Sequence, residues 1–483
     1  MSDTLKSKTI NGLKWSAIER FSAQGVQFVI QVFLARLLLP SDYGIIAMLT
    51  IFIAISQTFV DSGFSNALIR KLDRDEDDFT TAFIFNILVG LFFYGVLYFC
   101  SPFIADFYDI PLLSPITKFL GISVFFNSLC IVQQAILTIK IDFKTQTYVS
   151  LISVFIAGII AIYLAYTGLG AWALAWQVVI AAFLRAVILW ILVKWRPRGS
   201  FTKKSFKNLF GFGSKLLASG LINTIFNNIY LIVIGKVYSS KLLGYYSKAS
   251  EFSKYPASSI TSIIQRVTYP VLSEMQNDNE KLRVNYRKIL RLSVFIMFPI
   301  MVGISAIADP IIRLLLTDKW AFSIPLLQIL CFALMFYPIH AINLNLLQVK
   351  GRSDLFLRLE IIKKVLLTVI LIITLPMGVK ALCIGQVINS IICLIINTHY
   401  TSKLINVGFI KQMKDVLPTL LICLVMFGAI YLVNIFIDST AILHVNIWKL
   451  VIDIIFGALI FVGLSYLRNA KELKDIINII KFK

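Results

Sequence analysis

Charged and amide side chains recur at helical spacing inside an apolar stretch of the chain, KWSAIERFSAQGVQFVIQVFLARLLLPSDYG. Polar residues fall there at i, i+4, i+8, i+11 and i+15, which places them on one helix face: Ser16, Arg20, Gln24, Gln27 and Gln31. Counting about 1.5 Å per residue from Leu13 places Arg20 roughly 10 Å into the hydrocarbon of a membrane. A cation at the centre of a bilayer costs about 2.5–3.5 kcal/mol, so this face must contact protein or water.

Two further predicted helices, residues 209–236 and 243–268, carry similar polar faces. The first face holds Lys215, Ser219, Asn223, Asn227 and Tyr230, and the second holds Lys248, Glu251, Tyr255, Ser258 and Ser262. Lys254 adds another cation to the second helix. Single amides can simply bind helices together, and a lysine such as Lys215 can extend to the membrane surface. Together these groups exceed what packing needs, and they favour an aqueous cleft that binds a polar substrate.

Another polar patch lies in FYPIHAINLNLLQ, where we expect Pro338 to interrupt a helix and free backbone carbonyls. His340 and Asn343 are candidate substrate contacts in this stretch. Three carboxylates are candidates for charge balance or proton coupling: Glu19, Asp61 and Glu251. They are too dispersed to assign as an acid–base pair, and the sequence leaves both roles open.

The motifs of soluble enzymes are missing from the sequence. His340, His399 and His444 lack metal-ligand spacing, and no GxSxG, HExxH or phosphate-binding glycine loop occurs. The six cysteines lie inside apolar runs without CxxC spacing, so we expect small core residues rather than disulfides or metal ligands. We therefore predict a protein that is not an enzyme and uses no cofactor or metal.

Composition places the chain among polytopic membrane proteins. Of its 483 residues 58% are hydrophobic and only 15% charged, and mean hydropathy is +0.84. The pattern predicts about fourteen spans, near 11–35, 42–64, 80–104, 113–138, 148–167, 171–193, 209–236, 243–268, 289–308, 322–347, 357–376, 379–400, 415–437 and 446–467. Twelve spans remain an alternative, because the seventh and eighth runs are weakly apolar.

The net charge of +21 is concentrated between the spans, in alternate loops. Cations gather around residues 70–74, 140–144, 194–207, 280–291, 350–358 and 403–414 and in the carboxyl tail. Since lysine and arginine favour the cytoplasmic side, we expect both termini in the cytoplasm. No nucleic-acid-reading motif accompanies these cations, and no nucleic-acid partner is expected. The amino terminus lacks the pattern of a cleaved signal peptide, so we expect the first helix to be retained.

An internal repeat has an offset of about 200 residues. FLARLLLPSDYG aligns with VIGKVYSSKLLG, which pairs Arg36 with Lys236 and Gly44 with Gly244. Repeats of this kind build transporters around a site near the membrane midplane. We expect a six-helix lobe in residues 1–200, a second in 201–402, and two additional helices with a cytoplasmic tail in 403–483.

Several ordered stretches resemble the bacterial polysaccharide flippases, the Wzx-like proteins of the multidrug/oligosaccharidyl-lipid/polysaccharide exporter superfamily. They are FLARLLLPSDYGIIAM, FVDSGFSNALIRK, RVTYPVLSEMQNDNEKLRVNYRK and ADPIIRLLLTDKW. The resemblance covers nearly the whole chain and describes architecture more than a site. It implies an all-α membrane protein with two six-helix bundles in a V around a central cavity, plus two carboxyl-terminal helices.

The resemblance also implies a function: flipping a lipid-linked oligosaccharide across the inner membrane for lipopolysaccharide, capsule or exopolysaccharide synthesis, alongside other polysaccharide-assembly membrane proteins. Amides and hydroxyls would bind sugar hydroxyls, and Arg20, Lys215, Lys248 or Lys254 would bind phosphate. Two alternatives remain. A drug or cation antiporter of the same superfamily should have carboxylates and aromatics in its cavity, and a glycan polymerase should have a large external loop with catalytic groups.

Overall fold

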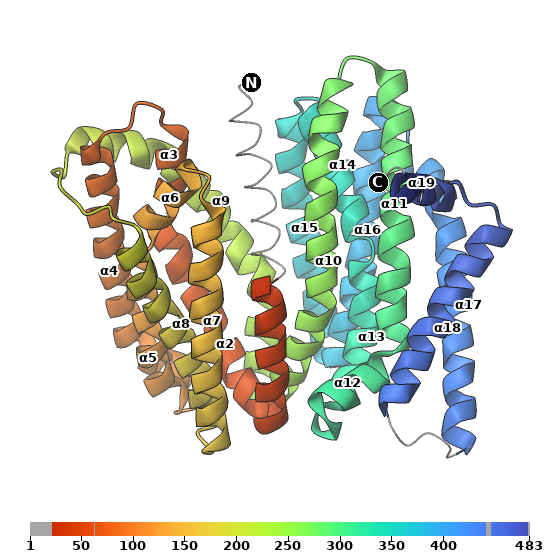
Figure 1. Cartoon of the computed structure of the whole chain (residues 1–483), viewed down its shortest axis with the longest axis horizontal. Helices are drawn as coiled ribbons and strands as arrows, with labels where there is room; N and C mark the ends of the chain where they lie inside the picture. The colour runs from red at the N-terminus through yellow and green to blue at the C-terminus, as the bar shows by residue number, and fades with distance from the viewer. Residues whose placement is uncertain (1–21, 62, 441–445, 482–483) are drawn as a thin grey trace. The chain divides into compact units, whose positions relative to one another are not determined.

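The computed structural model describes residues 22–61, 63–440 and 446–481, and every regular element in these ranges is helical (Figure 1). Eleven of the described helices or helix pairs are long and apolar enough to cross a membrane. Residues 22–37, α10 and α15 match three more predicted spans. Many large apolar side chains are exposed on these helices, as expected for surfaces that face lipid. The predicted all-α membrane fold is confirmed.

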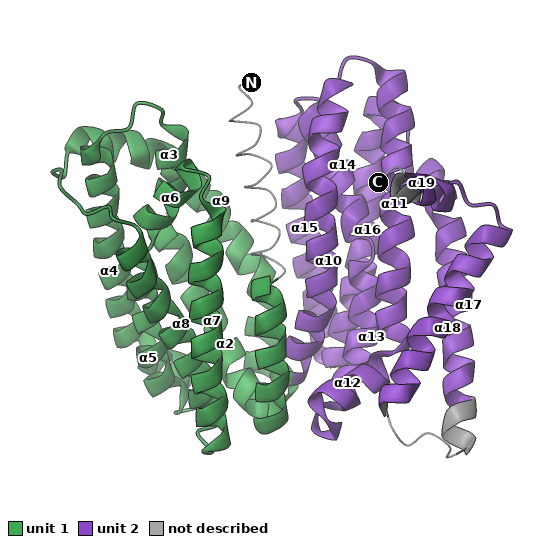
Figure 2. Cartoon of the chain, in the orientation of Figure 1, with its two compact units in different colours: residues 1–244 green, residues 245–483 purple. Residues whose placement is uncertain are grey.

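The chain divides into two compact units, residues 1–244 and 245–483 (Figure 2). Unit 1 contains the helix at 22–37 and then α2 (Pro40–Asp61), α3 (Phe64–Arg70), α4 (Glu76–Tyr108), α5 (Leu113–Ser128), α6 (Ile131–Ile139), α7 (Phe143–Tyr166), α8 (Ala171–Leu192) and α9 (Lys203–Val237). This division follows packing, with α9 against α2, α3 and α4. The predicted boundaries at 200 and 402 concern sequence repeats and stay predictions.

Unit 2 begins inside α10, whose first residues belong to unit 1. Its helices are α10 (Ser240–Glu274), α11 (Asn279–Ala306), α12 (Ala308–Leu316), α13 (Ser323–Leu334), α14 (Tyr337–Val349), α15 (Ser353–Thr374), α16 (Val379–Ile405), α17 (Phe409–Thr440), α18 (Asn446–Leu467) and α19 (Lys471–Lys481), with short 3-10 turns at Asp318–Trp320 and Leu375–Met377. α19 lies beside α11, where Lys288 Nζ is 3.2 Å from Asp475 Oδ2 (Figure 1).

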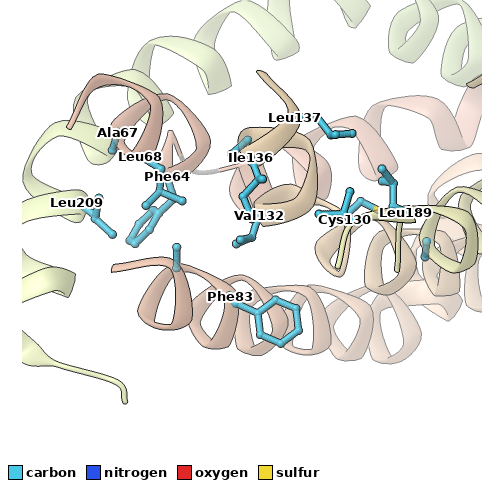
Figure 3. Close-up of a cluster of buried hydrophobic side chains, with 14 of the residues drawn as sticks. Phe64, Ala67, Leu68, Phe83, Cys130, Val132, Ile136, Leu137, Leu189 and Leu209 are labelled. Atoms are coloured by element: carbon cyan, nitrogen blue, oxygen red, sulfur yellow. The ribbon is translucent and has the colours of Figure 1, made fainter. Parts of the chain in front are cut away.

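The fourth and tenth predicted spans are each broken into two helices, α5–α6 and α13–α14. Pro338 stands in the first turn of α14, as the sequence predicted. The first break lies beside a packed core of unit 1, in which Phe64 and Leu68 of α3 meet Val132 and Ile136 of α6 (Figure 3). The two short helices therefore remain anchored in the unit although each is too short to span the membrane alone.

Cysteine burial agrees with the sequence expectation at five positions. Cys130, Cys331, Cys383, Cys393 and Cys423 are buried, and all six thiols are free. The expectation was wrong for Cys100, which is exposed near the end of α4. The reason is that only 22% of the most apolar part of α4 is buried, so an apolar run there does not imply a core position.

Candidate functional site

α9 carries an uncovered polar face through the membrane-spanning part of unit 1. Lys215, Ser219, Asn223 and Asn227 follow one another at intervals of four residues, and all four are exposed. Only 11% of the most apolar window of this helix is buried, against 56% for α5–α6. No described residue forms a hydrogen bond or ion pair with Lys215. Inside the predicted span, a cation with no partner among the described residues requires water or an anionic ligand.

A different face of α9 packs against α2. Thr58 Oγ1 lies 2.9 Å from Thr224 Oγ1, and a Cβ atom added at Gly220 would lie 3.2 Å from the Thr58 methyl group. Small side chains let the two backbones approach closely at this seam. α9 is therefore packed on this face, whereas the face with Lys215 and the asparagines is exposed.

The first helix contributes amides to unit 1. Gln24, Gln27 and Gln31 are each half-buried. Gln31 Nε2 donates to Gln177 Oε1 of α8 at 3.3 Å, so this side chain joins two helices of one unit. Arg20 and Glu19, which the sequence placed on the same helix, lie outside the described residues.

Asp61 ends α2 and is exposed. Its Oδ1 accepts a hydrogen bond from Gln57 Nε2 at 3.0 Å, and Gln57 in turn accepts from Asn127 Nδ2 at 3.1 Å. The structure gives Asp61 no ion pair with a described cation. The hydrogen bonds from Asn127 to Gln57 and from Gln57 to Asp61 thus orient the carboxylate. No cation in the described part of unit 1 forms an ion pair with it.

In unit 2, Lys248 and Glu251 of α10 form a buried ion pair. Lys248 is 2% exposed, and its Nζ lies 2.7 Å from Glu251 Oε2. The other carboxylate oxygen accepts a 3.0 Å hydrogen bond from the Tyr255 hydroxyl. Glu251 therefore bonds to Lys248 on one side and to Tyr255 on the other along α10.

Two other cations of α10 are exposed and have no hydrogen-bond or ion-pair partner among the described residues, Lys254 and Arg266. Lys254 lies eleven residues from the predicted outer end of the span, about 16 Å deep. Arg266 is twelve residues further along, about 18 Å from Lys254. The sequence reasoning missed Arg266, although the spacing from Lys254 through Ser258 and Ser262 leads to it.

His340 and Asn343 lie on α14 within a packed polar network of unit 2. His340 Nε2 is 3.1 Å from Ser390 Oγ, and its Nδ1 is 3.1 Å from Asn397 Nδ2. Asn343 is 1% exposed and accepts hydrogen bonds from the Tyr286 hydroxyl at 3.0 Å and from Thr401 Oγ1 at 2.5 Å. A side chain so enclosed has no surface left for a large ligand.

The described residues offer no ligand set for a metal ion. The described residues contain no group of three or more histidine, cysteine, aspartate or glutamate side chains placed to hold an ion. α9 exposes Lys215, Ser219, Asn223 and Asn227, and α10 exposes Lys254 and Arg266. The cations among them have no hydrogen-bond or ion-pair partner in the described part of the chain. Side chains of these kinds can bind hydroxyls and phosphates.

A family model described as "Polysaccharide biosynthesis protein" matches residues 33–325, more than half of the chain. The chain belongs to the polysaccharide biosynthesis protein family. The matched range contains Lys215, Lys248, Lys254 and Arg266 and ends before His340. Both exposed polar helices of this family member thus fall inside the region that defines the family.

Individual relatives have low sequence identity to this chain but align with most of its length. The lipopolysaccharide biosynthesis protein WzxC of Escherichia coli (strain K12) is 26% identical over 82% of this chain and 80% of its own length. The teichuronic acid biosynthesis protein TuaB of Bacillus subtilis (strain 168) is 25% identical over 73% of each chain. Similarity therefore spans most helices of this polysaccharide biosynthesis protein.

The fold also matches a solved membrane protein. The lipid II flippase MurJ, in an inward closed conformation, superposes with a TM-score of 0.77 and covers 96% of this chain and 100% of its own. Identity in that comparison is 17%, so it shows the fold alone. This family member has the helical architecture expected from its sequence.

Proposed function

We propose that the chain flips a lipid-linked oligosaccharide, a glycan repeat unit on polyprenyl pyrophosphate, across the bacterial inner membrane. Movement runs from the cytoplasmic to the outer leaflet by alternating access, for lipopolysaccharide, capsule or exopolysaccharide synthesis. Two relatives are named for lipopolysaccharide and teichuronic acid biosynthesis, and the solved protein with this fold is named a lipid II flippase. Family and fold together support a transporter of a glycan carried by lipid.

The observation that carries the proposal is that two exposed lysines, Lys215 of α9 and Lys254 of α10, each have no hydrogen-bond or ion-pair partner among the described residues. An ammonium group left without a protein partner inside a membrane is costly unless water or an anion reaches it. A pyrophosphate supplies that anion and forms charge-assisted hydrogen bonds with lysine. We assign phosphate binding to these two residues, add Arg266, and retain Arg20 for the same role.

Sugar hydroxyls need both donors and acceptors, which amides provide. We assign this role to Gln24, Gln27, Asn223 and Asn227, which are half-buried or exposed. Lys248 and Asn343 are buried, and Gln31 and His340 bond to side chains of other helices in their own units. We assign these four residues to orientation and packing.

Charge balance is the role we favour for Glu251 and Asp61. Glu251 neutralises Lys248 at 2.7 Å. Asp61 stands at the end of α2, exposed and held by Gln57, where it lowers the positive potential of the same unit as Lys215. Glu19 keeps the same proposed role. Cargo must also leave the cavity, so partial neutralisation that weakens phosphate binding suits a transporter.

Deletion of the gene in its native host tests the proposal. We expect an intact lipid-linked glycan to accumulate on the cytoplasmic leaflet, and mass spectrometry of the extracted lipid would identify that glycan. Wild-type protein supplied from a plasmid should clear the accumulated material. Accumulation of unpolymerised glycan on the outer leaflet would instead support a polymerase, and loss of drug resistance without any glycan change would support an antiporter.

A further inference from the structure

Unit 1 contains a cavity apart from the polar residues to which we assign cargo binding. It has a volume of about 480 Å³, within the range of small-ligand sites, and lies between α4, α5 and α8. Its wall is apolar and largely aromatic, with Arg196 as the one charged residue: Phe83, Phe126, Phe183, Val187, Trp190 and Arg196. None of these residues belongs to the polar faces of α9 or α10.

The break in the fourth span shapes this cavity. Leu129, which stands between α5 and α6, also lines it, and its carbonyl accepts a 3.1 Å hydrogen bond from Trp190 Nε1. Phe83 is only 7% exposed and belongs to the core cluster drawn in Figure 3. The floor of the cavity is therefore fixed by the unit's core, whereas the rim residues Phe183 and Ile191 are 45% and 69% exposed. This combination forms a crevice that is open toward lipid.

Positive charge gathers directly beside the crevice. The segment from 194 to 207 carries Lys194, Arg196, Arg198, Lys203, Lys204 and Lys207, and none of them forms an ion pair with a described residue. Carboxylates at the start of α4 contact this segment through its backbone N–H groups and the Trp195 indole rather than through its cationic side chains. Glu76 accepts from Trp195 Nε1 at 2.8 Å, Asp77 from the Ser200 N–H at 2.9 Å, and Asp78 from Lys71 at 2.5 Å.

Arg196 belongs both to the lining of the crevice and to the cationic segment 194–207. Its guanidinium lies 4.9 Å from the centre of the Trp190 ring. Three of its N–H groups donate to the carbonyls of Trp190, Val193 and Trp195, at 2.6, 3.0 and 2.8 Å. An arginine has five such donors, so two remain for an anion. The guanidinium is thereby held at the mouth of an apolar crevice with donors to spare.

We propose that this crevice binds one acyl chain of an anionic phospholipid of the cytoplasmic leaflet, with the lipid phosphate held by Arg196 and the neighbouring cations. The apolar crevice would bury the acyl chain, and cations that form no ion pair with a described residue would attract the headgroup. The site is distinct from the cargo path. It would make the protein sensitive to the content of anionic lipid in the membrane.

Photolabelling of the purified full-length chain in detergent tests the site. The probe is phosphatidylglycerol with a diazirine in one acyl chain, and labelled peptides are located by mass spectrometry. We expect label on residues 183–196, removed by unlabelled phosphatidylglycerol at much lower concentration than phosphatidylcholine. Val187→Trp fills the crevice and should abolish this label, whereas Ile159→Trp, on an exposed face of α7, should leave it unchanged.

The charge contribution is tested without touching Arg196, which also caps α8. In Lys194→Gln combined with Arg198→Gln, half-maximal labelling should need about fivefold more phosphatidylglycerol for each charge removed. Lys403→Gln, an exposed cation of unit 2, is the control and should have no effect. Equal labelling by phosphatidylcholine and phosphatidylglycerol probes would overturn the proposal, because the crevice would then hold ordinary boundary lipid. Displacement by polyprenyl phosphate at lower concentration than by phosphatidylglycerol would overturn it in favour of the cargo's isoprenoid tail.

Discussion

Gly44 of α2 packs directly against the backbone carbonyl of Ser240, the first residue of α10. The contact is reciprocal, because Gly244 packs in the same way against the carbonyl of Pro40, the first residue of α2. In each case a Cβ atom would overlap the carbonyl oxygen. The two glycines are 200 residues apart and occupy matching positions of the repeat that the sequence indicates. The close contact between the first turns of α2 and α10 therefore requires glycine at both positions, because any larger side chain would overlap the opposite backbone.

Replacing either glycine should destabilise the fold. Gly44→Ala or Gly244→Ala forces the helix ends apart, and overpacking of this kind costs about 1–3 kcal/mol. We expect a lower apparent melting temperature of the purified protein in detergent. Gly95→Ala in α4 is the matched control, since nothing lies within 4 Å of its Cβ position. Equal melting temperatures for all three variants would refute the close contact.

The buried ion pair of α10 gives a second prediction. Lys248→Gln leaves Glu251 without its cation, and because Glu251 is 27% exposed the cost should be about 1–3 kcal/mol rather than that of a fully buried charge. Folded protein should become less abundant in gel filtration. Adding Glu251→Gln removes the orphaned charge and should restore much of the loss. A double variant less stable than the single one would contradict this structural role.

Sequence periodicity predicted the helices well because lipid imposes a simple rule on length and polarity. The predicted span at 171–193 corresponds to α8, Ala171–Leu192, and the span at 446–467 to α18, Asn446–Leu467. It failed to sort polar side chains by accessibility. Asn343 is enclosed by partners from α11, α16 and α17, and its position along the sequence carries no sign of those contacts.

The same limit explains what the sequence missed. Arg266 is exposed, but only a structure shows that no described residue pairs with it. The sequence shows the carboxyl tail only as a set of cations, whereas the structure places most of it in α19, whose Glu472 and Asp475 form ion pairs with Arg291 and Lys288 of α11. Pairing between segments far apart in sequence cannot be deduced from one chain's periodicity.

Two asparagines distinguish packing from substrate contact. Asn343→Leu leaves Tyr286, Thr401 and Gln412 without a shared partner and should cost about 1–3 kcal/mol of stability. Asn227→Leu, on the exposed face of α9, should leave stability nearly unchanged and reduce glycan export instead. Asn343→Leu should therefore lower the melting temperature, and Asn227→Leu should lower export per folded molecule. The reverse pattern would move substrate binding from α9 to α14.

Membrane orientation can be tested with introduced cysteines. We propose that Ser200, in the cationic segment after α8, faces the cytoplasm and that Thr167, at the end of α7, faces outward. The background should be Cys100→Ser, since Cys100 is the one exposed native thiol. An impermeant thiol reagent applied to spheroplasts should label Thr167→Cys and not Ser200→Cys. The opposite labelling would invert the topology.

The central claim is that cations inside the membrane, without ion-pair partners among the described residues, bind the phosphate of a lipid-linked glycan. Its most direct test is transport in proteoliposomes that contain purified protein and polyprenyl pyrophosphate oligosaccharide. An impermeant glycosidase added outside the vesicles cleaves only the glycan that has reached the outer leaflet, and this cleavage is measured over time. We predict that wild-type protein makes the inner-leaflet glycan accessible. Lys254→Gln should slow this about tenfold or more, the loss expected from one charge-assisted hydrogen bond, and Lys254→Arg should retain most activity. Equal rates for wild type, Lys254→Gln and protein-free vesicles would contradict the account.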